Sequence, residues 1–206
     1  MGFFIVFEGL DGSGKSTQAK RLHEHFISIG ENCLLTNEST DGEIGRLARA
    51  VTKGELTLED ETLALLFAAD RYEHFSKKIS PVLNDGGIVV CDRYYHSNIA
   101  YQGLSEQTAS RILDYNQLVL KRPPDIVFFL DTEPQECLKR LELARKEISI
   151  YENPRYLEAL RDRYRSLFNR LGENIVTIKT SGKSEDDITK FCLQAYNATM
   201  TPPLLA

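Results

Sequence analysis

The stretch Gly9-Leu-Asp-Gly-Ser-Gly-Lys-Ser16 directly follows the apolar run Phe3-Phe-Ile-Val-Phe7. It fits the pattern G-x-x-x-x-G-K-S, in which glycines let successive backbone amides converge on one group of phosphate oxygens. Lys15 would add positive charge against the outer phosphates, and the Ser16 hydroxyl is the usual magnesium ligand in this motif. Apolar residues then recur at helical spacing as far as Ile29, which would place the positive end of a helix dipole under the anion. A chance match is the alternative, but strand, loop and helix occur here in the required order.

The composition is that of one compact domain. The chain has 206 residues, of which 42% are hydrophobic, enough for a sizeable core. The net charge of −5 argues against a broad nucleic-acid-binding face. No C-x-x-C pair occurs, so we expect reduced, buried cysteines in a cytoplasmic protein at Cys33, Cys91, Cys137 and Cys192. We see neither a secretory leader nor an apolar run of membrane-spanning length, so no membrane partner is expected.

Short apolar runs alternate with longer helical patterns along the chain. The predicted strands are 3–8, 32–37, 87–92, 125–131 and 174–180. The predicted helices are 15–29, 43–53, 58–83, 105–120, 134–145, 153–171 and 184–197. The strands read as continuous apolar runs, which predicts an α/β fold with a five-stranded parallel sheet and helices on both faces. Ligands bind beyond the carboxyl ends of such strands, so site residues should follow Phe7, Thr36, Cys91 and Leu130.

Asp92-Arg93-Tyr94 comes directly after the third predicted strand. A carboxylate there could hold magnesium across from Ser16, and the adjacent guanidinium could clamp a second phosphate. A surface ion pair is the alternative. At this point the chain resembles the thymidylate kinase family, P-loop nucleoside monophosphate kinases that convert dTMP to dTDP for dTTP synthesis. The resemblance implies a single domain over 1–206 with a lid at about 140–152. It also implies ATP as donor, Mg²⁺ as cofactor, and a homodimer that acts on small molecules.

Three segments carry the resemblance, namely 7–17, 66–72 and 92–103. For the first, it implies an ATP site made of Gly9, Leu10, Asp11, Gly12, Ser13, Gly14, Lys15, Ser16 and Thr17, and a magnesium site at Ser16 and Asp92. For dTMP, it implies that Asp11 reaches the sugar 3′-hydroxyl, Phe67 stacks on thymine and Arg71 donates to thymine O4. It further implies substrate contacts by Arg93, Ser97, Asn98, Tyr101 and Gln102.

Two of these aromatic residues have a plain alternative. A lone phenylalanine on a helix is more often core, although Phe67 and Arg71 lie four apart and so share one helix face. The ring of Tyr101, close to the sugar 2′ position, would crowd a ribose hydroxyl and favour deoxynucleotides; otherwise it is an amphipathic surface side chain. Leu63, Leu66 and Ala69 could belong to a dimer face or to the core.

Phosphoryl transfer spreads negative charge over the equatorial oxygens, where an arginine accelerates the reaction. Some family members carry this arginine in the phosphate loop, at the position of Gly12 here. We therefore expect catalysis by Lys15 and Arg93 with a lid residue, Arg145 first and Arg140 or Lys146 after it. The alternative is that these are surface charges in i,i+4 pairs with Glu136, Glu142 and their neighbours.

The chain departs from the family pattern at Asn37, at 148–150 and at Ala159, where arginines are common. Other functions therefore stay open: another nucleoside monophosphate kinase, a deoxynucleoside kinase with Glu38 as base, or a catalytically silent dTMP-binding relative. A GTPase-like switch would need an N-K-x-D element, which the sequence lacks. Selectivity between dTMP and dUMP cannot be read from these residues.

Overall fold

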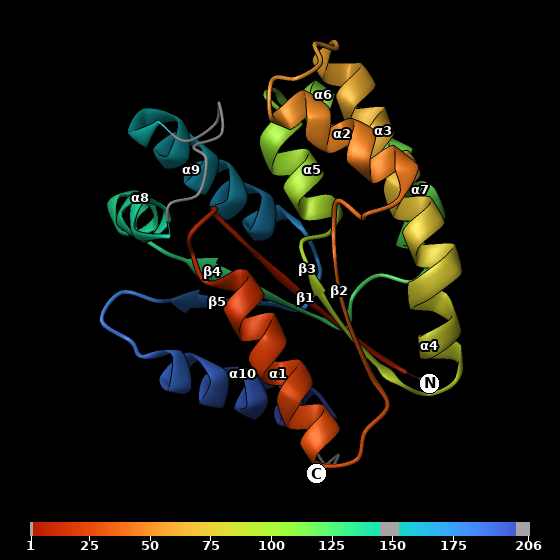
Figure 1. The fold of residues 1–206 in the computed structure, drawn as a ribbon, viewed down its shortest axis with the longest axis vertical. Coiled ribbons are helices and arrows are strands. Elements are labelled where there is room, and N and C mark those ends of the chain that lie inside the picture. Colours follow the sequence, from red (N-terminus) through yellow and green to blue (C-terminus); the bar gives the residue numbers. More distant parts are fainter. Residues whose placement is uncertain (1, 145–152, 201–206) are drawn as a thin grey trace.

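A computed structural model describes residues 2–144 and 153–200. Its centre is one parallel sheet in the order β2-β3-β1-β4-β5 (Figure 1). The strands are β1 (Phe3–Gly9), β2 (Cys33–Asn37), β3 (Ile88–Asp92), β4 (Ile126–Asp131) and β5 (Ile175–Lys179). All five predicted strands are confirmed, each bound within about one residue. The order reverses direction at β1, so the loop after β1 lies at the switch point where such sheets bind ligands.

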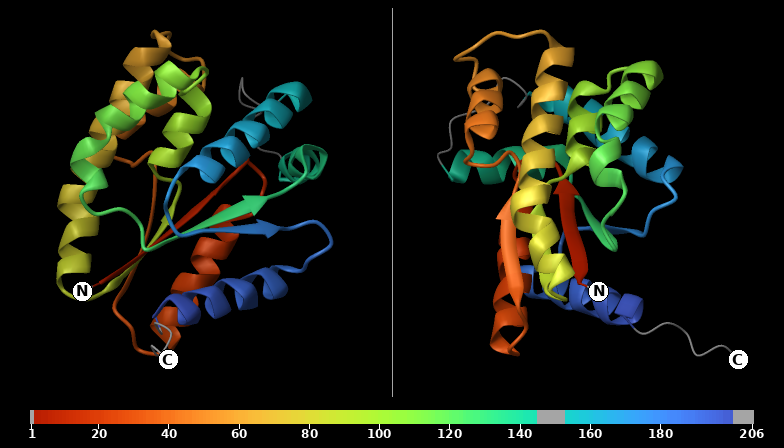
Figure 2. Two further views of the ribbon diagram at one scale, coloured as in Figure 1. Left: turned by 180° about the vertical axis from the view of Figure 1, so that it is seen from behind. Right: turned by 90° about the vertical axis from the view of Figure 1, so that its right-hand side faces the viewer.

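Alternate residues of each strand pack on opposite layers of helices. Ile5 and Phe7 of β1 face a core cluster with helices α1 (Lys15–Ser28) and α10 (Glu185–Met200). Phe4 and Val6 face a second cluster, which includes residues of α5 (Tyr95–Gln102) and α9 (Pro154–Arg170). Figure 2 shows the sheet between these two layers. Burial on both faces explains the continuous apolar runs. All four cysteines are free and buried, as expected.

The predicted helix over 58–83 is confirmed as one continuous helical stretch, which contains a π-helical turn that the sequence did not predict. The remaining elements are α2 (Glu43–Thr52), α3 (Asp60–His74), a π-helical turn η1 (Phe75–Ile79), α4 (Ser80–Asn84), α6 (Glu106–Tyr115), α7 (Gln117–Leu120) and α8 (Pro134–Leu143). Pro81, the second residue of α4, has no amide hydrogen for an i→i−4 bond, which fits a wider turn just before it.

In contrast, the predicted helix over 105–120 is interrupted at Asn116. The Asn116 side chain donates to the carbonyl of Ile112 at 2.7 Å, a local bond that competes with the regular helical ladder. In addition, α5 was not predicted at all. Its first turn is capped from a distance, because the Glu8 carboxylate accepts hydrogen bonds from the amides of Tyr94 and Ser97.

The predicted lid at 140–152 begins within α8, which ends at Leu143. Residues 145–152 lie outside the described residues, and with them the predicted catalytic residue Arg145. Among residues 2–144 and 153–200, no helix is both long enough and apolar enough to cross a bilayer.

Candidate functional site

The loop between β1 and α1 forms an anion cradle. Gly12 and Gly14 have φ of +80° and +100°, which side chains with a Cβ rarely adopt. Helix α1 begins at Lys15, so its free amides and positive dipole end point at the loop. The Lys15 ammonium is 5% exposed and donates to the Leu10 carbonyl at 2.6 Å. Burial, followed by the charge of Arg93, lowers the Lys15 pKa from its ordinary value.

Gly12 leaves no room for a larger side chain, such as the arginine that the family resemblance gives as an alternative at this position. A Cβ at Gly12 would lie 2.5 Å from the carbonyl oxygen of Cys137 on α8. The same helix supplies a different guanidinium, because Nη1 of Arg140 lies 3.3 Å from the carbonyls of Gly12 and Ser13. Nη2 of Arg140 pairs with Glu136 at 2.5 Å, which is the i,i+4 pair of the alternative.

Ser16 and Asp92, the two predicted magnesium ligands, are in direct contact beside the phosphate loop. The Ser16 hydroxyl donates to Asp92 Oδ2 at 2.5 Å. Oδ1 of Asp92 is buried without a hydrogen-bond partner, which leaves one carboxylate oxygen for a hard cation. No group of three or more His, Cys, Asp or Glu side chains within 2–144 and 153–200 could hold a metal alone. The pair therefore suits an ion that takes its other ligands from phosphate and water.

Arg93 has an unusual backbone conformation. Its φ of +71° is the left-handed region, costly for a residue with a Cβ, and its amide donates to Phe7 at 2.9 Å. This geometry turns the guanidinium toward Asp11 (2.6 Å), Tyr101 (3.3 Å) and Ser97 (2.9 Å). Such strain at a cleft is typical of functional residues.

Asp11, which lies in the phosphate loop, forms an ion pair with Arg93. Burial opposes ionisation of its carboxyl group, but Arg93 and Lys15 outweigh that effect and hold the Asp11 pKa below its ordinary value. Ser97 does not present a free hydroxyl, since it donates to Glu8 Oε2 at 2.6 Å while it accepts from Arg93. Sequence reasoning missed Glu8, which also accepts from Tyr164 at 3.0 Å. Its position just before the loop was the available signal.

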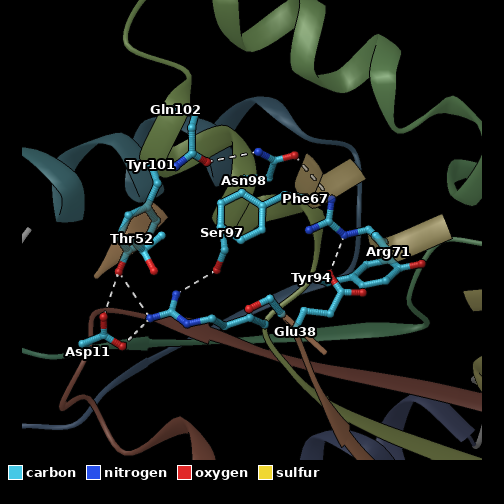
Figure 3. Close-up of a pocket in the computed structure, with 12 residues that line it drawn as sticks. Asp11, Glu38, Thr52, Phe67, Arg71, Tyr94, Ser97, Asn98, Tyr101 and Gln102 are labelled. Atoms are coloured by element: carbon cyan, nitrogen blue, oxygen red, sulfur yellow. Dashed lines mark hydrogen bonds and ion pairs between the residues drawn. The ribbon is translucent and has the colours of Figure 1, made fainter. Parts of the chain in front are cut away.

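A second pocket of about 190 Å³ opens beside the cradle (Figure 3). Its lining includes every predicted substrate residue: Asp11, Phe67, Arg71, Arg93, Ser97, Asn98, Tyr101 and Gln102. Phe67 both lines this pocket and packs against the small cluster of Ala48, Val51 and Leu63. It is therefore partly a core residue, as the alternative predicted, and partly exposed to the pocket. Thr52 also lines it and was not predicted.

The far end of this pocket is a buried polar network. Arg71 is 2% exposed, and its Nε donates to Glu38 Oε2 at 2.6 Å. The other oxygen of Glu38 lies 3.1 Å from Nδ1 of His74, whose Nε2 lies 2.7 Å from the Thr36 hydroxyl. Sequence reasoning missed His74, because only the fold brings α3 against the end of β2.

The two pockets share a wall. The cradle belongs to a larger cavity of about 830 Å³, and both cavities are lined by Asp11, Glu38 and Arg93. Asn37 lines the larger cavity, and its amide donates to the Ser39 carbonyl at 3.1 Å. Two anionic groups bound in these cavities would therefore face each other across Arg93.

Behind the site, His96 is fully buried between two carboxylates. Its Nε2 lies 2.8 Å from Glu173 and its Nδ1 lies 3.7 Å from Glu8. Burial lowers the His96 pKa, but the hydrogen bond to Glu173 and the negative charges of Glu173 and Glu8 outweigh this, so the pKa is raised above its ordinary value. The Glu8 pKa is lowered, because contact with His96 outweighs burial.

These shifts predict a pH dependence of stability. A raised His96 pKa means that its contribution is complete below the ordinary value of about 6.5 and is lost as the pH rises through the folded value. We expect His96→Gln to lower the unfolding temperature more at about pH 6 than at about pH 9. His25→Gln, partly exposed on α1, is the control. A pH-independent difference for His96→Gln would contradict the assignment.

The chain matches known proteins along most of its length. The family model described as Thymidylate kinase matches residues 7–190. A probable thymidylate kinase of Methanococcus aeolicus is 39% identical over 194 residues, which cover 92% of this chain and 93% of that protein. One of Pyrococcus horikoshii is 44% identical over 147 residues, covering 69% and 71%. The crystal structure of thymidylate kinase from Ehrlichia chaffeensis superposes with a TM-score of 0.74 at 30% identity, covering 96% of this chain and all of that one.

Proposed function

This chain belongs to the thymidylate kinase family, enzymes that transfer a phosphoryl group from ATP to dTMP, and from this premise we propose where each substrate binds. ATP lies in the larger cavity, with its β- and γ-phosphates on the loop at 9–16. The nucleoside of dTMP lies in the smaller pocket, with its base toward Phe67 and Arg71. The observation that supports this arrangement is the wall shared by the two cavities at Asp11, Glu38 and Arg93.

The proposed reaction is direct in-line transfer. A phosphate oxygen of dTMP attacks the γ-phosphorus of ATP, the bond to the β,γ-bridging oxygen breaks, and ADP leaves. The attacking oxygen is already ionised near neutral pH, so no strong general base is needed. Lys15 and Arg93 bind the phosphates and stabilise the charge that develops during transfer, while Asp11 and Tyr101 hold Arg93 in place.

Mg²⁺ fits the same arrangement. Ser16 and Asp92 would hold it, because one Asp92 oxygen is buried without a partner and the Ser16 hydroxyl lies beside the other. When bound, the ion would neutralise part of the phosphate charge. Arg140 is the described residue on α8 best placed to add charge at the loop, and Arg145 remains a proposal from the family resemblance alone.

An acceptor panel tests the proposal: dTMP, dUMP, dCMP, AMP and thymidine, each with ATP and magnesium, followed by ADP release. We expect dTMP to be the preferred acceptor and thymidine to be inactive. A deoxynucleoside kinase would need a free carboxylate base, whereas Glu38 is buried and held by Arg71 and His74. Phosphorylation of thymidine, or no ADP release with dTMP, would refute the assignment.

We also propose that the enzyme is a cytoplasmic homodimer, with α3 in the interface. Leu63 is 2% exposed and Leu66 packs on the same small core cluster, so these two residues fit the core alternative. The exposed side of α3 carries Ala69 together with Leu65 and Tyr72, which are 47% and 48% exposed. Such an apolar stripe is typical of an interface. The four free cysteines are consistent with a reducing compartment.

The dimer prediction has a matched test. Leu65→Glu should convert a dimer into a monomer, because a charge would be buried without a partner. Ile27→Glu on α1, where Ile27 is 50% exposed, is the control and should leave the mass unchanged. Light scattering at micromolar protein gives the mass. A monomeric wild-type protein, or equal effects of the two substitutions, would refute this interface.

A further inference from the structure

Asn116, at the break between α6 and α7, is a buried polar residue with a fixed orientation. It is 2% exposed, and its Nδ2 donates to the Ile112 carbonyl at 2.7 Å. A backbone carbonyl can only accept, so the amide cannot be reversed without losing this bond. The Asn116 Oδ1 must therefore face the other way, where it accepts a hydrogen bond from Nη1 of Arg71 at 2.7 Å.

This contact completes the anchoring of the Arg71 guanidinium. Nε donates to Glu38 at 2.6 Å, and Nη1 donates to Asn116 and, at 3.4 Å, to Asn98. For Nη2 the structure gives no hydrogen-bond partner among residues 2–144 and 153–200. Arg71 lines the smaller pocket together with Phe67 (Figure 3). Two nitrogens are thus held by the protein, and the third is left for a ligand.

The hydrogen bonds of Arg71 and Asn116 also fix the orientation of the Asn98 side-chain amide. Asn98 Oδ1 faces Arg71 and, at 3.5 Å, Asn116 Nδ2, so its own Nδ2 is directed to Gln102 Oε1 at 3.1 Å. The polarity of these side chains is therefore fixed at both ends, by the Ile112 carbonyl, which only accepts, and by the Arg71 guanidinium, which only donates. A network with a single allowed polarity presents the same donors and acceptors to every ligand.

We infer that Asn116 is a positioning residue that sets the nucleobase preference of the acceptor site through Arg71 and Asn98. The inference rests on the proposed function. A guanidinium only donates, so it suits a pyrimidine with an oxygen at position 4 and opposes one with an amino group there. Without Asn116, Nη1 of Arg71 would lose its 2.7 Å hydrogen bond. The guanidinium would then be held less firmly in the orientation that favours an oxygen at position 4 of the base.

The test compares dTMP with dCMP for three variants. Asn116→Leu should raise KM for dTMP about tenfold, the usual effect of losing one hydrogen bond to a charged group, and should reduce the dTMP to dCMP ratio of kcat/KM. KM for ATP should not change. Asn116→Asp keeps the acceptor for Arg71 and should keep most of the ratio. Val119→Ala, equally buried one turn on, loses packing without touching Arg71 and is the control.

The possible outcomes distinguish a wrong proposed function from a wrong role for Asn116. A wild-type enzyme that does not phosphorylate dTMP would refute the proposed function and this inference with it. A wild-type enzyme active on dTMP, together with an unchanged dTMP to dCMP ratio in folded Asn116→Leu, would refute the role of Asn116 alone. An equal change in Val119→Ala would do the same. If Asn116→Leu does not fold, Asn116→Ser decides, since its hydroxyl is too short to reach Arg71.

Discussion

Replacement of Lys15 by methionine should lower kcat for dTMP phosphorylation about 10³-fold, comparable with the loss of other charge-stabilising donors in phosphoryl and acyl transfer. The ammonium belongs to the first residue of α1 and donates to the Leu10 carbonyl in the phosphate loop. Methionine keeps the length of the side chain and removes its charge. Steady-state kinetics with saturating ATP and dTMP measures the loss.

The fold should survive this substitution. Burial lowers the Lys15 pKa, so the charged form is held at a cost that an apolar side chain of similar size does not have. We therefore expect the unfolding temperature of Lys15→Met to equal or exceed that of the wild type. Lys20→Met, on the exposed side of the same helix, is the kinetic control. Full activity of Lys15→Met would show that the phosphates are held by other groups.

The sheet could be predicted because its signal is local. Runs such as Ile126-Val-Phe-Phe-Leu130 are buried on both faces. A short, continuous apolar run between turn residues is typical of a strand in a parallel sheet covered by helices. The phosphate loop is equally local, since its glycines and Lys15 are consecutive. These features needed no knowledge of distant parts of the chain.

Helix α5 and the polar networks could not be predicted, because their partners are distant in sequence. The first-turn amides of α5 are capped by Glu8, which is 86 residues before Tyr94. Asn116 interrupts a helical pattern through a local bond to Ile112, but its contact with Arg71 exists only because the fold places α3 beside it. The sequence pattern around such residues predicts ordinary turns or helix. Their roles depend on contacts that exist only after folding.

Replacement of Arg93 by methionine should lower kcat/KM for dTMP by about 10²- to 10³-fold and change KM for ATP much less. Arg93 lies in the wall between the two cavities and is 17% exposed. Methionine also has a Cβ, so the strain at φ +71° is unchanged and only the guanidinium is lost. Kinetics with each substrate varied in turn separates the two effects.

The matched control for Arg93 is Arg122, a guanidinium of similar burial at the opposite end of the sheet. Arg122 is 20% exposed and pairs with Asp125 at 2.6 Å, as Arg93 pairs with Asp11 at the same distance. Arg122→Met should therefore affect stability without a specific loss of dTMP turnover. An equal loss in both variants would mean that Arg93 acts through folding. A loss confined to KM for ATP would place Arg93 in the donor site, and the two cavities would then not meet as proposed.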